Sequence, residues 1–247
     1  MHRALDADFP EDDFQVETTL KAIRRQLAGT PYQTLPISPE ILQQLYRFID
    51  INDPEQLANW CCILTGFRCL LRKSNLVPVS IEKFNPETGL SRSKIMLPPN
   101  RDVALVYLNW SKTNQFGNRE FVIPMVSDPV QALDPVYHLQ LLFSANDLPD
   151  HLPAFSFIKR GCVRCITYDK FTASLRKLLD KAGYRSKSYS GHSLRRGGAS
   201  YLYRLGADPL LIQATGDWQS DCYLRYISLS LEQRLAAQIK MATATKF

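Results

Sequence analysis

The sequence predicts a mainly α-helical protein of the α+β class, in which a small antiparallel β-sheet is inserted between two helical parts. Apolar residues recur at helical spacing before residue 72 and again after Pro129. The stretch from Val77 to Val126 is instead rich in strand-forming residues and is broken by turn sequences. The 247 residues are 45% hydrophobic and 22% charged, which is typical of a globular protein and excludes a disordered chain.

The charge is distributed unevenly along the chain. Residues 1–20 carry a net charge of −5, so the remainder carries +11 although the whole chain has only +6. A basic body of this kind favours a polyanionic partner, most often nucleic acid. The first thirteen residues lack a signal-peptide pattern, and no apolar stretch is long enough to cross a bilayer. We therefore expect a soluble, intracellular protein with reduced cysteines, located in the nucleus if its host is eukaryotic and otherwise in the cytoplasm or nucleoid.

The first part of the chain is expected to be a mobile acidic leader, a short helix over Val16–Leu27 and a linker over Gly29–Pro39, which contains three prolines. A helix then begins at Pro39, and a second one covers about Pro54–Leu71. The second helix is apolar on most sides, which predicts that it is buried together with its cysteines.

Three strands are predicted next, because short β-rich runs alternate with sequences typical of turns. They cover Val77–Phe84, Val103–Trp110 and Glu120–Val126. Cys162 and Cys165, further along, have a spacing known from zinc sites. No matching second pair follows, so ordinary thiols are favoured over a metal site.

The last part of the chain is predicted to be helical. An apolar stripe from Phe171 to Leu179 is ended by Gly183, and a further helix covers about Ser193–Leu205. Asp208 and Pro209 begin a short helix that ends at Gly216. Ser220 or Asp221 then caps a helix that carries Tyr223 and Tyr226.

Candidate chemistry starts at His192 and Arg195, one turn apart at a helix N-terminus. Backbone N–H groups and a guanidinium there favour an anion such as phosphate, and an imidazole transfers protons near neutral pH. Alone, this pair is more often an ordinary surface pair. Arg72, however, emerges from a very apolar segment, where an arginine needs a partner; a structural salt bridge is the alternative.

Further candidates follow in sequence order. Lys112 lies at a hairpin tip, where it is either solvated or able to reach a phosphodiester, and Trp218 precedes Tyr226 by eight residues. Together, the candidates resemble the motifs of the tyrosine recombinases of the phage-integrase type. Residues 71–76 are similar to the first arginine box of that family, residues 111–113 to its hairpin lysine, and residues 191–200 to its His-x-x-Arg box. Residues 216–227 look like the closing box of Crypton-type mobile elements of eukaryotes, and the resemblance covers roughly residues 36–230.

The resemblance implies a helical catalytic domain that cleaves and rejoins DNA through a covalent 3′-phosphotyrosine on Tyr226. His192 would take the tyrosine proton, and Lys112 would protonate the departing 5′ oxygen. Arg72, Arg195 and Trp218 would stabilise the phosphate oxygens. No metal or nucleotide cofactor is implied, and the chain has no P-loop, dinucleotide glycine motif or HExxH. Asn75 stands where the family usually has an acid; it cannot supply the negative charge but can still orient Arg72 or His192 by a hydrogen bond.

The resemblance also implies DNA as the partner and an oligomer, from dimer to tetramer, joined through the C-terminal tail. The stretch from Lys159 to Arg196 has a net charge of +9 and is expected to bind the DNA backbone. The DNA-binding candidates are Lys73, Lys159, Arg160, Arg164, Lys170, Arg185, Lys187 and Arg196.

Residues 1–35 are interpreted as the leader and the remnant of a core-binding domain, and residues 36–247 as the catalytic domain. Two alternatives to a strand-exchanging recombinase remain open. One is a domesticated module that binds DNA without cutting it, for which Asn75 is the sequence support. The other is a nicking-closing enzyme like the type IB topoisomerases.

Overall fold

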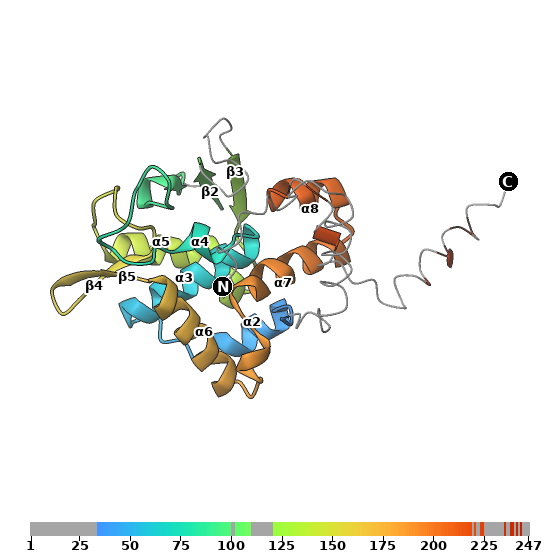
Figure 1. Cartoon of the computed structure of the whole chain (residues 1–247), viewed down its shortest axis with the longest axis horizontal. Helices are drawn as coiled ribbons and strands as arrows, with labels where there is room; N and C mark the ends of the chain where they lie inside the picture. Colours follow the sequence, from blue (N-terminus) through green and yellow to red (C-terminus); the bar gives the residue numbers. More distant parts are fainter. Residues whose placement is uncertain are drawn as a thin grey trace, which may run out of the picture. The chain divides into compact units, whose positions relative to one another are not determined.

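The computed structural model describes residues 34–99, 102–109, 121–218, 220 and 223–224, and residues 235, 238, 239, 241 and 243 of the tail (Figure 1). The chain divides into two compact units, Met1–Gln33 and Thr34–Phe247, and every described residue belongs to the second unit. The helix predicted at Val16–Leu27 lies outside the described residues.

The second unit begins with two helices, α2 (Pro39–Tyr46) and α3 (Pro54–Arg68). Both have a proline in the first turn, as the sequence predicts, and the structure adds a capping side chain before each of them. Helix α3 is buried on almost every side, and it packs against α5 (Pro135–Ala145), α7 (Gly191–Arg204) and β4 (Ser156–Lys159). It therefore forms the centre of the core.

Helix α3 ends earlier than Leu71, because Leu70 adopts the left-handed backbone conformation with φ of 52°. The N–H of Leu71 then donates to the carbonyl of Gly66 at 3.1 Å, which closes the helix in a Schellman motif. That position normally holds glycine, so no residue in the sequence signalled the stop.

The strand predicted at Val77–Phe84 is absent from the structure, and that prediction was wrong. The short helix α4 (Lys73–Leu76) occupies the start of this segment, and Val77 N–H still donates to Lys73 O. Pro78 follows without an N–H to offer a sheet, and the chain continues in bends and turns to Phe84.

The sheet is formed by β1 (Ile95–Met96), β2 (Val103–Leu108) and β3 (Phe121–Val126), in the order β1-β2-β3. All pairs are antiparallel, with Val106 opposite Ile95 on one side and Ile123 on the other. The second and third predicted strands are confirmed, within the residues that the structure describes, with slightly shorter bounds. A 3₁₀ turn at Arg92–Lys94 precedes β1, and another at Gln131–Leu133 precedes α5.

A second, two-stranded sheet was not predicted. It pairs β4 with β5 (Cys162–Cys165) through a two-residue turn in which Arg160 and Gly161 both have positive φ, 55° and 74°. Cys162 is exposed and Cys165 is buried, because residues three apart on a strand point to opposite faces. Their thiols therefore do not converge on one metal ion.

The remaining helices are α6 (Tyr168–Lys181), α7 and α8 (Pro209–Thr215), with a 3₁₀ turn at Ser186–Ser188 between α6 and α7. Each of the three helices matches a prediction. Asp208 caps α8 by accepting from Leu210 N–H, and Gly216 ends it. The described part of the chain is thus mainly helical with a small antiparallel sheet, as the sequence predicts.

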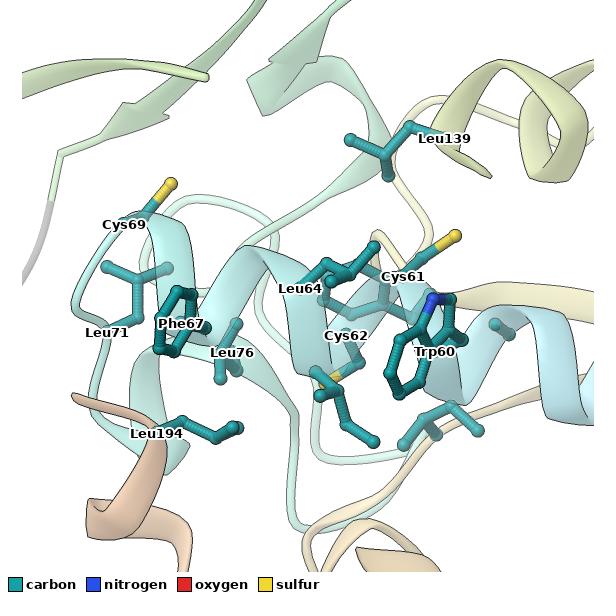
Figure 2. Close-up of a cluster of buried hydrophobic side chains, with 14 of the residues drawn as sticks. Trp60, Cys61, Cys62, Leu64, Phe67, Cys69, Leu71, Leu76, Leu139 and Leu194 are labelled. Carbon is teal, nitrogen blue, oxygen red and sulfur yellow. The ribbon is translucent and has the colours of Figure 1, made fainter. Parts of the chain in front are cut away.

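The main core surrounds α3. Figure 2 shows Trp60, Leu64 and Phe67 of α3 in this cluster, with Leu194 of α7 reaching toward Leu76. Cys61 and Cys62 are fully buried free thiols, as expected. Among the described residues, none of the helices combines the length and the apolar character needed to cross a membrane.

A second, smaller cluster consists of Leu70, Ala199, Ile212, Trp218 and Tyr223. It joins the end of α3 to α7, α8 and the segment after α8. Two predicted site residues, Arg195 and Trp218, meet at this cluster.

Candidate active site

Arg72 is placed by the chain reversal at the end of α3. It is the residue before α4, with an extended backbone at ψ of 149°, and its carbonyl accepts the N–H groups of Asn75 and Leu76 at 2.9 and 3.2 Å. The side chain is half-buried. The expected emergence of Arg72 from an apolar segment is therefore seen, and Asn75, which is buried, belongs to the turn that Arg72 begins.

His192 and Arg195 lie in the first turns of α7. The helix begins two residues earlier than predicted, because Ser190 caps it: Ser190 Oγ accepts from His192 N–H at 3.2 Å, and Ser190 N–H donates to Ser193 Oγ at 3.0 Å. His192 is exposed, whereas Arg195 points inward and is 3% exposed. The His192 side chain is therefore accessible from the surface, whereas the Arg195 side chain is held within the protein.

The Arg195 guanidinium is fixed by the backbone on both sides. Its Nη1 donates to the carbonyl of Leu70 at 2.5 Å, and its Nη2 donates to the carbonyl of Gly216 at 2.6 Å. The first bond joins α7 to the loop that carries Arg72, and the second joins α7 to the segment that carries Trp218. Arg195 is thus a structural centre of the site as well as a candidate phosphate ligand.

Trp218 stacks on Arg195. The guanidinium carbon lies 3.8 Å from the centroid of the indole, which is 6% exposed. Gly216 makes this possible, because a Cβ there would lie 1.9 Å from the indole ring. Asp217 between them has a positive φ of 51°, so the chain turns sharply to bring the indole back over α7. The Tyr223 ring packs on the other residues of this cluster, with its centroid 6.1 Å from that of Trp218.

The electrostatics of His192 reflect the cations around it. Although His192 is exposed at the surface, the protein around its ring reduces the hydration of the charged form and lowers its pKa from the ordinary value, and the positive charges of Arg195, Arg72 and Lys73 lower it further. The imidazole is therefore neutral at pH 7 and able to accept a proton. The effect of Arg72 on His192 also indicates that this arginine, which is distant in the sequence, lies near the start of α7 in the fold.

This arrangement is suited to an anion. Arg72 and Arg195 supply positive charge beside the N-terminal end of α7, where the helix dipole also favours negative charge. The neutral imidazole supplies a base at the same place. A phosphodiester bound here would have charge stabilisation and proton transfer available together.

Two predicted catalytic residues, Lys112 and Tyr226, lie outside the described residues. The structure therefore brings together Arg72, His192, Arg195 and Trp218 of the predicted catalytic set. Asn75 lies next to them, and its backbone N–H contact to Arg72 is local to the α4 turn.

The predicted DNA-binding residues fall into two groups. Arg160, Arg164, Arg185 and Lys187 are exposed. The other four are engaged within the protein. Lys159 pairs with Asp53 and Glu55, and Lys170 lies 3.9 Å from Glu55. Arg196 donates to the carbonyl of Thr34 at 2.7 Å, and Lys73 contacts Tyr168 and Thr172 of α6.

Leu70 and Gly216 support Arg195, and the sequence indicated this role for neither of them, although Gly216 was expected as a helix end and as the first residue of the closing box. They act through backbone carbonyls, which every residue has, and Leu70 lies 125 residues from Arg195 in the sequence. Only the positive φ of Leu70, which the sequence does not reveal, marks the position as special.

Comparisons with known proteins agree with this picture. The profile of the phage integrase family matches residues 37–228. No curated protein matches the chain. Among solved structures, the XerH site-specific recombinase in a post-cleavage complex with its difH substrate matches with a TM-score of 0.56 at 15% identity. That match covers 85% of this chain and 54% of the XerH chain, so this chain spans about half the length of that protein.

Two further structures are similar. The XerA recombinase matches with a TM-score of 0.55 at 16% identity, covering 91% of this chain and 73% of XerA. The integrase of the Tn1549 transposon, in complex with a circular intermediate DNA, matches with a TM-score of 0.54 at 13% identity, covering 91% and 75%. At these identities the likeness establishes a shared fold.

Proposed function

The chain belongs to the phage integrase family, and from that premise we propose that it is a site-specific recombinase that cleaves and rejoins DNA through a covalent 3′-phosphotyrosine. Family membership supports a DNA breaking-rejoining enzyme of the tyrosine type. The observation that carries the proposal is the meeting of Arg72, His192 and Arg195, with Trp218 stacked on the second arginine. Metal ions and nucleotides have no part in the proposed reaction.

In the proposed reaction, the Tyr226 hydroxyl attacks the scissile phosphorus. A bond forms from the tyrosine oxygen to phosphorus, and the bond from phosphorus to the 5′ oxygen breaks. His192 takes the tyrosine proton, and Lys112 gives a proton to the departing oxygen. A 5′ hydroxyl from another strand then reverses these steps and rejoins the DNA. The roles of Tyr226 and Lys112 rest on the family motifs.

In this proposal, Arg72, Arg195 and Trp218 stabilise the charge on the phosphate oxygens. Negative charge grows on the non-bridging oxygens as the five-coordinate phosphorus forms. Since two backbone carbonyls already hold the Arg195 guanidinium, it needs no rearrangement when that charge develops. The neutral state of His192 supports its role as the base.

The proposal is tested by trapping the covalent intermediate. Nicked duplexes with randomised sequence around the nick are incubated with the full chain, and protein–DNA adducts are isolated under denaturing conditions. We expect an adduct with the wild type, and its loss with Tyr226→Phe. Tyr223→Phe is the matched control, because Tyr223 lies three residues away and packs in the cluster below Arg195. An adduct that persists in Tyr226→Phe and is lost in Tyr223→Phe would move the nucleophile to Tyr223.

A DNA-binding module without cleavage is the second candidate, and Asn75 favours it. Asn75 cannot supply the negative charge that the family usually has at this position. Salt-dependent binding with no adduct on any nicked duplex supports this candidate. Relaxation of a supercoiled plasmid that lacks a recombination site supports the third one, the nicking-closing enzyme.

The finer assignments are also part of the proposal. Residues 36–247 are proposed to form the catalytic domain, and residues 1–35 precede it. Residues 216–227 support a Crypton-type mobile element and a nuclear location. The DNA partner is a recombination site or the termini of the element, which the basic body of the protein supports.

The protein is proposed to form a dimer to tetramer on DNA through its tail. Leu235, Ile239 and Met241 of the tail are 58%, 54% and 64% exposed, which leaves an apolar surface to be covered. Leu205 at the end of α7 and Leu210 and Leu211 of α8 are 65%, 70% and 58% exposed and are suited to receive the tail of a second copy. We expect the double variant Leu235→Asp/Ile239→Asp to bind DNA as a monomer in sedimentation experiments, whereas unchanged assembly would remove the tail from the interface.

A further inference from the structure

The ammonium group of Lys73 is held by the first turns of α6. Its Nζ donates to Thr172 Oγ1 at 2.8 Å and lies 3.2 Å from the centroid of the Tyr168 ring. Thr172 Oγ1 in turn donates to the carbonyl of Tyr168 at 2.9 Å. The hydroxyl therefore accepts from the lysine and donates to the backbone, and the ring covers the charge by a cation–π contact. Lys73 is thus fixed at its tip.

The aliphatic part of Lys73 supports the start of α7. A Cβ at Gly191 would lie 3.0 Å from Lys73 Cβ and 3.1 Å from its Cδ. The first residue of α7 therefore rests directly on the lysine side chain, at a distance that only glycine permits without a shift. His192 is the next residue in the chain, so this contact lies directly beside the backbone that carries the imidazole.

Lys73 also lies between the elements that carry the site. It follows Arg72 in the chain and begins α4. The backbone N–H of Tyr168 donates to the carbonyl of Pro78 at 2.9 Å, which ties the start of α6 to the segment after α4. The Lys73 side chain is a second connection between these segments, through Thr172 and Tyr168. Unlike the Tyr168–Pro78 hydrogen bond, it also reaches the first residue of α7.

We propose that Lys73 is a positioning residue of the cleavage site, which fixes the start of α7 against α4 and α6 so that His192 and Arg72 face the same phosphate. This inference rests on the proposed function and replaces the expected role of Lys73 as a contact to the DNA backbone. Its charge also acts on His192, whose pKa is lowered by Arg195, Arg72 and Lys73 in addition to burial.

The two roles of Lys73 predict opposite results for Lys73→Met, which keeps most of the aliphatic chain and removes the charge. For a positioning residue, the cleavage rate at saturating nicked DNA falls about tenfold, while the Kd and its salt dependence stay unchanged. For a phosphate contact, DNA binding weakens and the slope of log K against log salt falls by about 0.9, with the rate of the bound complex unchanged. The second result would overturn the proposal.

Paired variants of α6 keep the test valid if Lys73→Met folds poorly. Tyr168→Phe retains the ring and is expected to cleave at the wild-type rate, whereas Tyr168→Leu removes the cation–π contact and lowers the rate. Thr172→Ser retains the hydroxyl, whereas Thr172→Val removes it. Equal rates within both pairs would contradict the proposal. Lys83→Met, an exposed lysine in the turn after α4, is the control for the loss of one positive charge.

The pH profile separates positioning from a general structural role. His192 accepts a proton only when it is neutral, so the cleavage rate falls as the pH drops through its pKa. Removing the Lys73 charge raises that pKa, and the acid limb in Lys73→Met therefore moves to higher pH. A lower rate with an unmoved limb would assign Lys73 to stability alone.

An NMR titration of the His192 imidazole in the full chain without DNA keeps the inference separate from the proposed function. We expect the titration midpoint to rise in Lys73→Met and to stay in place in Lys83→Met. Absence of any adduct in the wild type would contradict the recombinase assignment, whereas an unshifted His192 midpoint in Lys73→Met would contradict the role of Lys73.

Discussion

Arg195 shows how a candidate site residue can also hold the fold together. The sequence places it beside His192 on a helix, and local spacing suffices for that prediction. Its bonds to the carbonyls of Leu70 and Gly216 were not predictable, because they join segments 125 and 21 residues away through groups that carry no sequence signal. At the residue scale, the sequence indicates which residues are candidates for the site. It does not indicate the backbone contacts that hold them in place.

Gly216→Ala tests the support of Trp218. A Cβ at this position would lie 1.9 Å from the indole ring, so the ring has to leave its place over Arg195. We expect the rate of adduct formation to fall by more than tenfold. Losing one oriented group at a site of charge stabilisation typically lowers a rate by about 10². Gly183→Ala is the control, because its cost comes from a φ of +82° with no atom within 4 Å. Similar rates in the two variants, measured with nicked DNA, would show that the contact is unimportant.

His138 gives a prediction for stability against pH. It is fully buried in α5, with Nδ1 2.7 Å from the carbonyl of Asp134 and Nε2 3.2 Å from the Tyr46 hydroxyl. Burial lowers its pKa, against the opposing effect of Asp134. The unfolded chain, with an ordinary histidine pKa of about 6.5, therefore takes up the proton first as the pH falls, and the free energy of unfolding decreases below that pH.

Urea denaturation between pH 7.5 and 5.5 measures this effect. We expect the free energy of unfolding of the wild type to decline over that range more steeply than that of His138→Gln, which has no titrating group at this position. Tyr46→Phe, which keeps the imidazole, retains a decline. Parallel curves for the wild type and His138→Gln would show that the histidine does not titrate differently in the two states.

At the scale of elements, the sequence predicts helices well where capping residues and prolines mark their ends. Asp53, Asp208 and Ser190 each accept from the first turn of a helix, and the corresponding helices begin within two residues of the predicted starts. The failures occur where a residue takes an uncommon conformation. Leu70 ends α3 in a glycine position, and Pro78 prevents the strand that the β-branched residues around it favour.

Helix α7 is sensitive to substitution at its glycines, because it packs closely against the backbone of other segments. A Cβ at Gly197 would lie 1.8 Å from the carbonyl oxygen of Ile37, and one at Gly198 would lie 2.2 Å from that of Phe67. These neighbours are backbone atoms and cannot rotate away. Although alanine favours a helix over glycine by about 1 kcal/mol, we expect Gly197→Ala to lower the free energy of unfolding by about 1–3 kcal/mol.

Urea denaturation of the full chain checks the Gly197 prediction. The isolated peptide 189–206 is the control, because the same substitution should raise its helicity in circular dichroism when Ile37 is missing. A protein that becomes more stable with Gly197→Ala would show that α7 does not approach the segment before α2 as closely as the structure places it.

At the scale of the whole molecule, the net charge predicts a nucleic-acid partner but not which cations contact it. The basic stretch from Lys159 onward includes residues whose partners lie more than a hundred positions earlier. Lys159 Nζ lies 3.1 Å from Asp53 and 2.9 Å from Glu55 at the start of α3. Charge counting therefore overstates the cations available to DNA, because tertiary ion pairs cannot be read from composition.

The salt dependence of DNA binding tests this distinction. We expect Arg164→Met, at an exposed position of β5, to lower the slope of log K against log salt by about 0.9. Lys159→Met should leave the slope unchanged, because its charge is already paired with two carboxylates. The slopes are measured by fluorescence anisotropy. An equal loss of slope in both variants would show that Lys159 contacts DNA.

The two carbonyls that hold Arg195 are made at different stages of synthesis. A ribosome delivers Leu70 long before Gly216, and domains fold as units once their residues have emerged. Arg195 therefore gains its second anchor only when synthesis has passed α8. A nascent or truncated chain that still lacks Gly216 therefore has the Arg195 guanidinium held on one side only.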